Sequence, residues 1–267
     1  MKTLTVERAI EVCEVESVRE VGENVHVLRF LSPRLARDIL PGQFINVKID
    51  STNVPLLRRP FSVYHTEGSS VDLIFNPVGL GTTKLAGKGV GSSLDVLGPL
   101  GTPYDVEGEF DTALLVAGGL GVAPLPLLTK VLKKVGKSVV TFLGGRTIRH
   151  VVSDHLENVS VATDDVSAGF RGTVVELIRN SLHEYSRLKI FACGPMPMLK
   201  NLAHLAQSVS IPCEASIECA MACGFGICQG CPVELVPRSG SEAEQFGKYA
   251  LVCKSGPVFD TRYIIFP

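Results

Sequence analysis

The chain lacks an excess of charge of either sign and has no long run of basic residues. Of its 267 residues, 26 are Lys or Arg and 27 are Asp or Glu, which gives a formal net charge of −1. Proteins that bind nucleic acids or anionic membranes usually concentrate basic residues on one surface. The composition therefore favours neither of these as a partner.

An apolar leader and a membrane-spanning run are also missing. The stretch Met1–Arg8 has no apolar core of the kind found in signal peptides. The uncharged stretch Thr112–Thr129 contains three glycines and two prolines, which favours a buried strand, a turn and the start of a helix over a membrane span. We therefore expect a soluble, cytoplasmic protein, long enough for two or three domains.

Hydrolytic motifs are absent as well. The sequence has neither H-E-x-x-H nor G-x-S-x-G, so zinc-catalytic and serine-hydrolase chemistry lack support. Its six histidines are scattered. The closest pair, His150 and His155, would not share a helix face, and we expect it to lie in a solvated turn.

Cysteine, in contrast, is plentiful, and without a secretion signal its eight copies favour metal or redox chemistry over disulfides. Cys223, Cys228 and Cys231 follow a C-x4-C-x2-C spacing, and Cys253 comes after a gap of 21 residues. This is the plant-type spacing of a [2Fe–2S] cluster. A structural zinc site also uses four cysteines, but it usually combines two short Cys-Cys pairs, and Cys253 has no close partner. Cys219 is a rival ligand, although its use would break the spacing.

The N-terminal region, up to about residue 104, has the pattern of an all-β domain. Turn signals separate its β-rich runs, and six such strands favour a small closed antiparallel barrel. The expected strands are Ala9–Val18, Val25–Phe30, Phe44–Ile49, Phe61–His65, Val71–Phe75 and Ser93–Leu97.

Two features of this region suggest a flavin. In Arg59-Pro60-Phe61-Ser62 a guanidinium could hold a pyrophosphate, an aromatic ring could cover a flavin, and a hydroxyl could reach its polar edge. The glycine-rich run from Gly79 to Leu85 has the pattern of an anion-binding loop that leads into a helix. Taken separately, Arg59 could be a surface ion pair and the glycines an ordinary turn.

From about residue 105 to 212, strands and helices alternate, as in a parallel α/β sheet. The apolar run Ala113–Ala117 leads into a glycine-rich turn, Gly118–Pro124, and then into an expected helix, Leu125–Val135. Such a turn holds a dinucleotide pyrophosphate in this class of fold, although Pro124 replaces the third glycine of the usual fingerprint. Cys193, at the end of an expected strand, is by itself more typical of a buried structural thiol.

Together, these motifs resemble the ferredoxin–NADP reductase family of flavoproteins. The resemblance implies an α+β multidomain fold: a six-stranded antiparallel Greek-key β-barrel over residues 1–104, a parallel α/β nucleotide-binding domain over 105–212 and a small [2Fe–2S] module over 213–267. It also implies FAD contacts on the barrel and NAD contacts on the second domain. The implied FAD residues are Arg59, Pro60, Phe61, Ser62, Ile74, Phe75, Asn76, Gly81 and Thr82. The implied NAD residues are Gly118, Gly119, Gly121, Cys193, Gly194 and Pro195.

The order of the three parts narrows the resemblance to the electron transfer subunits of type B dihydroorotate dehydrogenases, over nearly the whole chain. The departures are Phe61, where a small aliphatic residue or tyrosine is more common, and Cys219-Ala220 before the cluster motif. This resemblance implies a catalytic partner subunit with FMN, in a heterotetramer of two plus two chains that serves pyrimidine biosynthesis. Electrons would pass from dihydroorotate through FMN, [2Fe–2S] and FAD to NAD⁺.

Three alternatives remain at this level. One is the small subunit of an NAD-dependent ferredoxin:NADP oxidoreductase or of a sulfide dehydrogenase, whose members tend to have aspartate where this chain has Cys223. Another is a zinc-stabilised nucleotide-binding regulator. The third concerns the nucleotide, because Arg146 could read a 2′-phosphate, although we favour NAD.

The cluster loop has apolar residues (Met221, Phe225 and Ile227) and no Lys or Arg from Ala215 to Pro237. It is therefore either a partner surface or packed inward.

Overall fold

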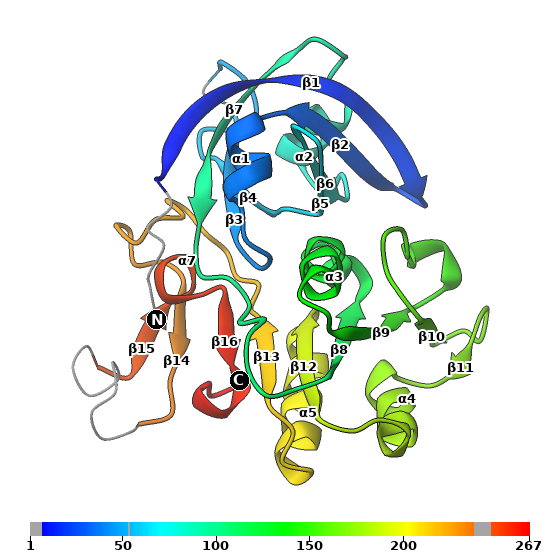
Figure 1. Cartoon of the computed structure of the whole chain (residues 1–267). Coiled ribbons are helices and arrows are strands. Elements are labelled where there is room, and N and C mark those ends of the chain that lie inside the picture. The colour runs from blue at the N-terminus through cyan, green and yellow to red at the C-terminus, as the bar shows by residue number, and fades with distance from the viewer. Residues whose placement is uncertain (1–6, 53, 238–246) are drawn as a thin grey trace.

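The computed structural model describes residues 7–52, 54–237 and 247–267. Its N-terminal part is a sheet of seven antiparallel strands in the order β4-β3-β7-β1-β2-β6-β5, at the top of Figure 1. The strands are β1 Ala9–Gly22, β2 Val25–Leu31, β3 Phe44–Lys48, β4 Arg59–Ser62, β5 His65–Glu67, β6 Ser70–Phe75 and β7 Ser93–Leu100.

The sheet has one strand more than the six predicted, because the expected strand 61–65 is divided into β4 and β5. β4 pairs with β3, whereas β5 pairs with β6. The two edge strands are thus consecutive in the chain and only Val63 and Tyr64 separate them, so the sheet has to curl round on itself. This explains why a single β-rich run forms two strands: the chain passes from one neighbour to the other as the barrel closes.

Successive side chains of β3 point to opposite faces of the strand, so this strand contributes to two different cores. Ile45 and Val47 point into the barrel core, whereas Phe44 belongs to a second core shared with the C-terminal residues. Asn46 therefore lies on the outer face of the strand, as Phe44 does. Two short helices complete the barrel region, α1 Pro33–Asp38 and α2 Leu80–Ala86.

The second sheet has the order β11-β10-β9-β8-β12-β13-β16, in which only β16 runs antiparallel to its neighbour. Its strands are β8 Thr112–Gly118, β9 Ser138–Gly145, β10 Val159–Thr163, β11 Phe170–Arg171, β12 Leu188–Cys193, β13 Cys213–Ser216 and β16 Val258–Asp260. The predicted parallel α/β arrangement is confirmed.

Helices cover both faces of this sheet. Figure 1 shows α3 (Leu125–Lys134) between the sheet and the barrel, with α4 (Val174–Ser181) and α5 (Met196–Ser208) on the other side. The core on the α3 side takes Leu115 from β8, and the opposite core takes Leu114. A strand buried on both faces has to be continuously apolar, and this explains the uninterrupted apolar run from 113 to 117.

The C-terminal residues join the other two parts. β13 and β16 extend the second sheet, while β14 (Pro232–Glu234) and β15 (Tyr249–Leu251) form a small hairpin followed by α7 (Val252–Ser255). The backbone N–H of Thr102, at the end of the barrel, donates to the carbonyl of Gly256 at 2.6 Å. The domain limits at 104 and 212 stay a prediction, since residues beyond 212 share the nucleotide sheet.

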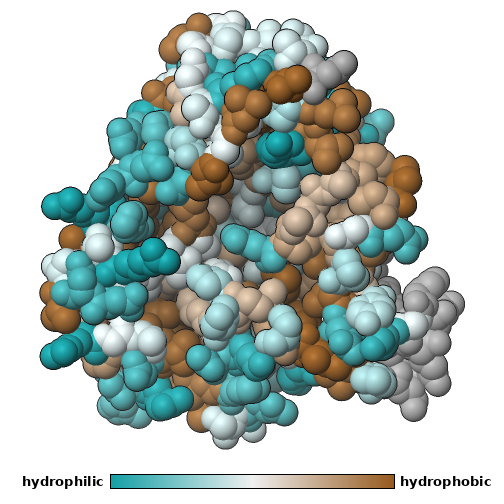
Figure 2. Space-filling model, turned by 180° about the vertical axis from the view of Figure 1, so that it is seen from behind, coloured by the Kyte–Doolittle hydropathy of each residue, from teal (hydrophilic) through white to brown (hydrophobic). Residues whose placement is uncertain are grey.

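Within the described ranges, no helix is both long and apolar enough to cross a membrane. Figure 2 shows the face opposite to that of Figure 1, where hydrophilic side chains prevail at the left and brown patches of hydrophobic side chains gather over the barrel.

Candidate functional site

The glycine-rich turn after β8 packs directly on the turn after β12. A Cβ atom on Gly121 would overlap with the carbonyl of Cys193, and one on Gly118 would lie 2.8 Å from the Cδ of Pro195. Gly194, with φ +153°, has its own ideal Cβ position 2.9 Å from the N of Gly118. Only glycine permits such an approach. The structure thus brings together five residues predicted from two separate motifs.

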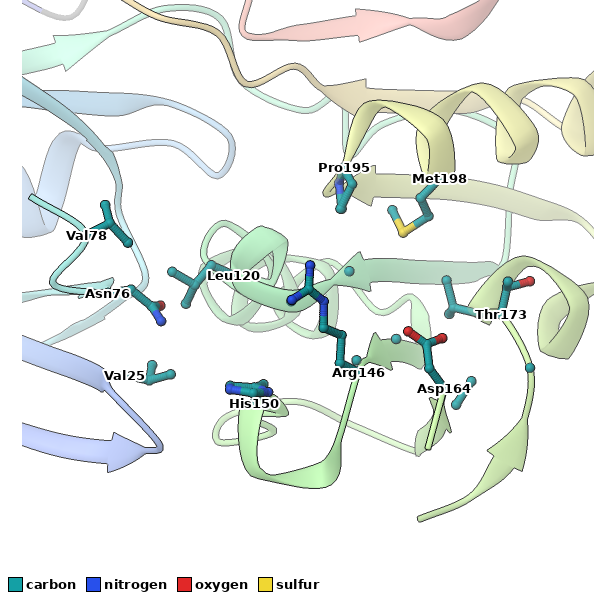
Figure 3. A pocket seen from close by; sticks show the side chains of 17 residues that line it. Val25, Asn76, Val78, Leu120, Arg146, His150, Asp164, Thr173, Pro195 and Met198 are labelled. Carbon is teal, nitrogen blue, oxygen red and sulfur yellow. The ribbon is translucent and has the colours of Figure 1, made fainter. Parts of the chain in front are cut away.

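A cavity of about 550 Å³ opens beside these turns, between the barrel and the second sheet. Figure 3 shows Val25, Asn76 and Val78 on the barrel side and Leu120, Pro195 and Met198 on the other. Gly119 also lines the cavity, with φ +54° and nothing within 4 Å of its ideal Cβ position. This volume is in the range of known cofactor sites, about 300–1,000 Å³.

Polar groups in this cavity fit a nucleotide. The side-chain oxygen of Asn76 is buried and has no hydrogen-bond partner among the residues that the structure describes, so it is available to a ligand. Arg146 follows β9 and points toward the middle of the cavity, with Asp164 and Thr173 beside it (Figure 3). These three residues follow the carboxyl ends of parallel strands, which is where such sheets bind ligands. The predicted solvated turn is found for His155 only, because His150 ends a short 3-10 helix and lines the cavity instead.

The two predicted phosphate-binding features of the barrel are also neighbours. The Nε of Arg59 lies 3.2 Å from the ideal Cβ position of Gly81. The hydroxyl of Thr82 accepts from the N–H groups of Val78 and Gly79 at 2.9 and 3.2 Å, which holds the loop at the start of α2. Arg59 donates only to the carbonyl of Leu57, at 2.6 Å, among the contacts of the described residues. Its guanidinium retains donors for an anion.

Phe61 faces the barrel core rather than an open surface. It is 9% exposed, and its ring meets Phe75 edge-on, with 5.8 Å between the ring centroids. Ile74 and Phe75 are buried too. Ser62 lies opposite Phe44 in the ladder and is half-buried. The expected role of Phe61 against a flavin therefore stays a prediction.

Cys193 is the last residue of β12 and is 1% exposed. Burial raises the pKa of its thiol well above the ordinary value, and the nearby Glu218 acts in the same direction. The Glu218 Oε1 lies 3.8 Å from the Cys193 Sγ. The thiol is thus protonated at neutral pH. It packs behind the glycine turn and does not itself line the cavity.

The four predicted ligand cysteines form two pairs. Cys231 and Cys253 are buried, with their sulfur atoms 3.3 Å apart. Cys223 and Cys228 lie on the outer loop, where the N–H of Cys228 donates to the Cys223 sulfur at 3.4 Å. Burial acts to raise the pKa of the Cys223 thiol, but the N–H groups of Cys228, Phe225 and Ile227 lower it to about 6.

The arrangement in pairs fits a two-iron cluster better than a single zinc ion. Each iron of a [2Fe–2S] cluster takes two thiolates, whereas a zinc site gathers four around one ion. Burial raises the pKa of the Cys219 thiol to about 11, and the neighbouring Cys231 adds to this effect. Cys219 thus lies beside a predicted ligand, and the C-x4-C-x2-C spacing is the reason for leaving it out of the ligand set.

Sequence reasoning missed Asn46. Its side-chain amide donates to the carbonyl of Cys223 at 2.9 Å, and the residue is 1% exposed. A polar residue between Ile45 and Val47 has the pattern of a solvent-facing strand position. No local signal indicates that a loop 177 residues away covers it.

Comparisons with known proteins agree with this architecture. A sequence profile described as the iron-sulfur cluster binding domain of dihydroorotate dehydrogenase B matches residues 218–265. Two similar curated proteins are both named dihydroorotate dehydrogenase B (NAD(+)), electron transfer subunit. The one from Bacillus caldolyticus is 40% identical over 254 residues, which covers 92% of this chain and 94% of that protein. The one from Desulforamulus reducens is 33% identical over 259 residues, with 94% and 97% covered.

Among solved structures, an NADH-dependent reduced ferredoxin-NADP oxidoreductase aligns with a TM-score of 0.82 and 27% identity, covering 95% of this chain and 90% of that one. A ferredoxin reductase of carbazole 1,9a-dioxygenase, at 21% identity and a TM-score of 0.67, covers 78% of this chain and 68% of its own and supports the fold alone. The curated relatives match nearly end to end at 33–40% identity. The chain therefore belongs to the family of dihydroorotate dehydrogenase B (NAD(+)) electron transfer subunits, an oxidoreductase component with an iron–sulfur domain and a flavin-reductase fold.

Proposed function

We propose that this chain transfers electrons from an FMN-containing catalytic dihydroorotate dehydrogenase subunit to NAD⁺, and that it binds a [2Fe–2S] cluster and FAD for this purpose. The observation that carries the proposal is the contact between the cysteine loop and the barrel. Asn46, which holds the Cys223 carbonyl, lies opposite Pro60 in the β3–β4 ladder. The cysteine motif and the predicted flavin motif thus occupy adjoining surfaces of the same strand pair.

The cluster would be held by Cys223, Cys228, Cys231 and Cys253. Glycine supports this loop where it bends, since Gly224 and Gly226 have φ values of +78° and +93°. The N–H groups that reach the Cys223 sulfur favour its thiolate, the form that binds iron. The exposed end of the loop supports electron exchange with another chain.

FAD would be held by the barrel. Arg59, beside Gly81 and Thr82, would bind its phosphates, and the segment Ile74–Asn76 would follow its ribityl chain. Pro60, Phe61 and Ser62 would border the ring. A flavin exchanges either a hydride or single electrons, and a cluster accepts one electron at a time, which is the chemistry that these groups supply when bound.

NAD would enter the cavity between the barrel and the second sheet. Gly118 and Gly119 line this cavity, where Gly119 leaves room for a pyrophosphate close to the backbone, and Pro195 lines it beside them. Gly121 and Gly194 would support the site from behind, because they let the two turns pack on each other. The Cys193 thiol, neutral because it is buried behind the glycine turn, would place no charge near a bound nicotinamide. Asp164 beside Arg146 supports NAD over NADP, because a carboxylate would repel a 2′-phosphate.

The finer features of the assembly belong to the same proposal. We expect two copies of this chain with two catalytic subunits, in the cytoplasm. All eight cysteines lie in the described ranges and are free, which suits a reducing compartment. The catalytic subunit would dock over the exposed Phe225 and Ile227, which are 41% and 76% exposed.

Purification and reconstitution test this function. The isolated chain should contain flavin and about two irons, should lack zinc, and should oxidise NADH with an artificial acceptor. Oxidation of dihydroorotate coupled to NAD⁺ reduction should begin only after the catalytic subunit is added. Zinc in place of iron, or a colourless protein, would contradict the proposal. Turnover with ferredoxin but not with the dihydroorotate-oxidising subunit would favour instead the function named for the structurally similar oxidoreductase.

A further inference from the structure

Asn46 is a buried polar side chain at a junction between two parts of the molecule. It is 1% exposed, and its amide nitrogen donates to the Cys223 carbonyl at 2.9 Å. A Cβ atom on the next residue, Gly224, would overlap with that same amide nitrogen. The loop therefore rests its backbone directly on the Asn46 side chain, and Gly224 permits this contact.

The barrel fixes Asn46 from its other side. Pro60, its partner in the β3–β4 ladder, has no N–H group. Arg58 instead reaches the Asn46 carbonyl at 3.4 Å, and its guanidinium is held by the Asp95 carboxylate at 2.8 Å. The neighbours Ile45 and Val47 anchor the strand in the barrel core. Asn46 is thus a rigid point from which a donor extends to the cysteine loop.

The contact has a consequence for the Cys223 sulfur. In a trans peptide the carbonyl and the N–H point in opposite directions, so a bond to the Cys223 carbonyl fixes the orientation of the whole Cys223–Gly224 peptide. The N–H group of Cys228 donates to the Cys223 sulfur at 3.4 Å, and the N–H groups of Phe225 and Ile227 also act on this sulfur. Hydrogen bonds to the sulfur ligands of an iron–sulfur cluster affect its reduction potential.

We propose that Asn46 is a positioning residue that fixes the Cys223–Cys228 loop on the flavin-binding strand pair and thereby sets the reduction potential of the cluster. This inference rests on the proposed function, because it requires the cluster at these cysteines. Loss of the Asn46 donor releases the peptide and weakens the N–H bonds to the Cys223 sulfur. The oxidised, less negative form of the cluster then gains relative to the reduced form.

The test uses the purified full chain with its cofactors. Asn46→Leu removes the donor at similar volume, Asn46→Ala removes it with the rest of the side chain, and Lys48→Met changes the next outer position on β3 as a matched control. A redox titration followed by electron paramagnetic resonance measures the equilibrium for reduction of the cluster. That equilibrium should fall about fivefold in both Asn46 variants, as expected for the loss of one hydrogen bond. Their resonance should change shape as well, while FAD content and NADH oxidation by an artificial acceptor stay at the wild-type level.

A second measurement does not depend on the cluster. In the iron-free chain, amide hydrogen exchange over residues 223–228 should be faster in both Asn46 variants than in wild type and Lys48→Met. Unchanged titration, resonance and exchange would overturn the proposal. Loss of FAD from both variants would overturn it too, because it would show that Asn46 supports the barrel instead. Absence of iron from the wild-type chain is a different result, since it would contradict the proposed function itself.

Discussion

The sulfur atoms of Cys231 and Cys253 lie 3.3 Å apart, although 22 positions separate these residues in the chain. Both belong to the hydrophobic core shared by the barrel end and the second sheet, which also contains Phe44 and Val252. The other two cysteines of the motif lie on the outer loop. One half of the proposed cluster site is thus built into the core, and the other half faces the surface.

This division leads to a prediction about the ligand set. Replacing Cys223, Cys228, Cys231 or Cys253 by serine should remove or severely deplete the cluster, because serine is a poor substitute for a thiolate ligand. The Cys219→Ser variant should keep its iron even though Cys219 contacts Cys231. Iron and sulfide analysis with a visible spectrum measures the outcome. A cluster-free Cys219→Ser protein would show that the ligand set is wrong.

Arg59 is predicted to bind the FAD phosphates. The Arg59→Ala variant should weaken FAD binding by about 30- to 150-fold, which is about 2–3 kcal/mol, because a charged donor pair is lost. FAD retention during dialysis, followed by a binding titration, measures this. The adjacent Arg58 supplies the control, since its guanidinium is engaged by Asp95. Arg58→Ala should lose far less affinity, and equal retention by wild type and Arg59→Ala would refute the assignment.

The exposed apolar residues of the cluster loop lead to a prediction about docking. Phe225→Asp and Ile227→Asp should each abolish the reconstituted dihydroorotate:NAD⁺ reaction, because a carboxylate would be buried without a partner at the interface. NADH oxidation with an artificial acceptor should remain. Val90→Asp, at a comparably exposed apolar position of the barrel, is the control. Full activity of both loop variants in the reconstituted assay would place the partner elsewhere.

The half-buried His65 leads to a prediction about pH. Its ring stacks on His155, with 4.0 Å between centroids and 6° between the ring planes. Burial lowers the pKa of His65 to about 4, and the neighbouring His155 and Lys130 add to this effect. The unfolded chain has an ordinary histidine pKa of about 6.5. Below that pH the unfolded state therefore binds the proton first, and stability falls as the pH drops from about 6.5 toward 4.

Urea unfolding at several pH values measures this loss. One proton changes the free energy of unfolding by at most about 1.4 kcal/mol per pH unit, and solvent around the half-buried ring makes the His65 contribution smaller. His65→Phe preserves an aromatic stack without binding a proton, so its stability should change less over this range. His183→Phe, at an exposed position, is the control. Identical pH profiles for wild type and His65→Phe would rule out this role.

The sequence by itself determined the features whose signal is local. The cysteine spacing predicted the cluster domain, and the apolar run before Gly118–Pro124 predicted a strand, a turn and a helix that the structure contains. These patterns are readable because a short loop around a metal or a phosphate has to place its residues at fixed intervals. Glycine is needed where the backbone comes close, as Gly121 does to Cys193.

Only the tertiary structure decided which distant segments meet. It divided one expected strand into β4 and β5, because barrel closure gives the two halves different neighbours. It directed the Phe61 side chain into the barrel core. It also placed Cys219 beside Cys231, although the cysteine spacing leaves Cys219 out of the ligand set. It also joined Asn46 to Cys223 across 177 positions. Such contacts depend on how the barrel, the second sheet and the C-terminal residues pack against one another. A local pattern of residue types cannot predict that packing.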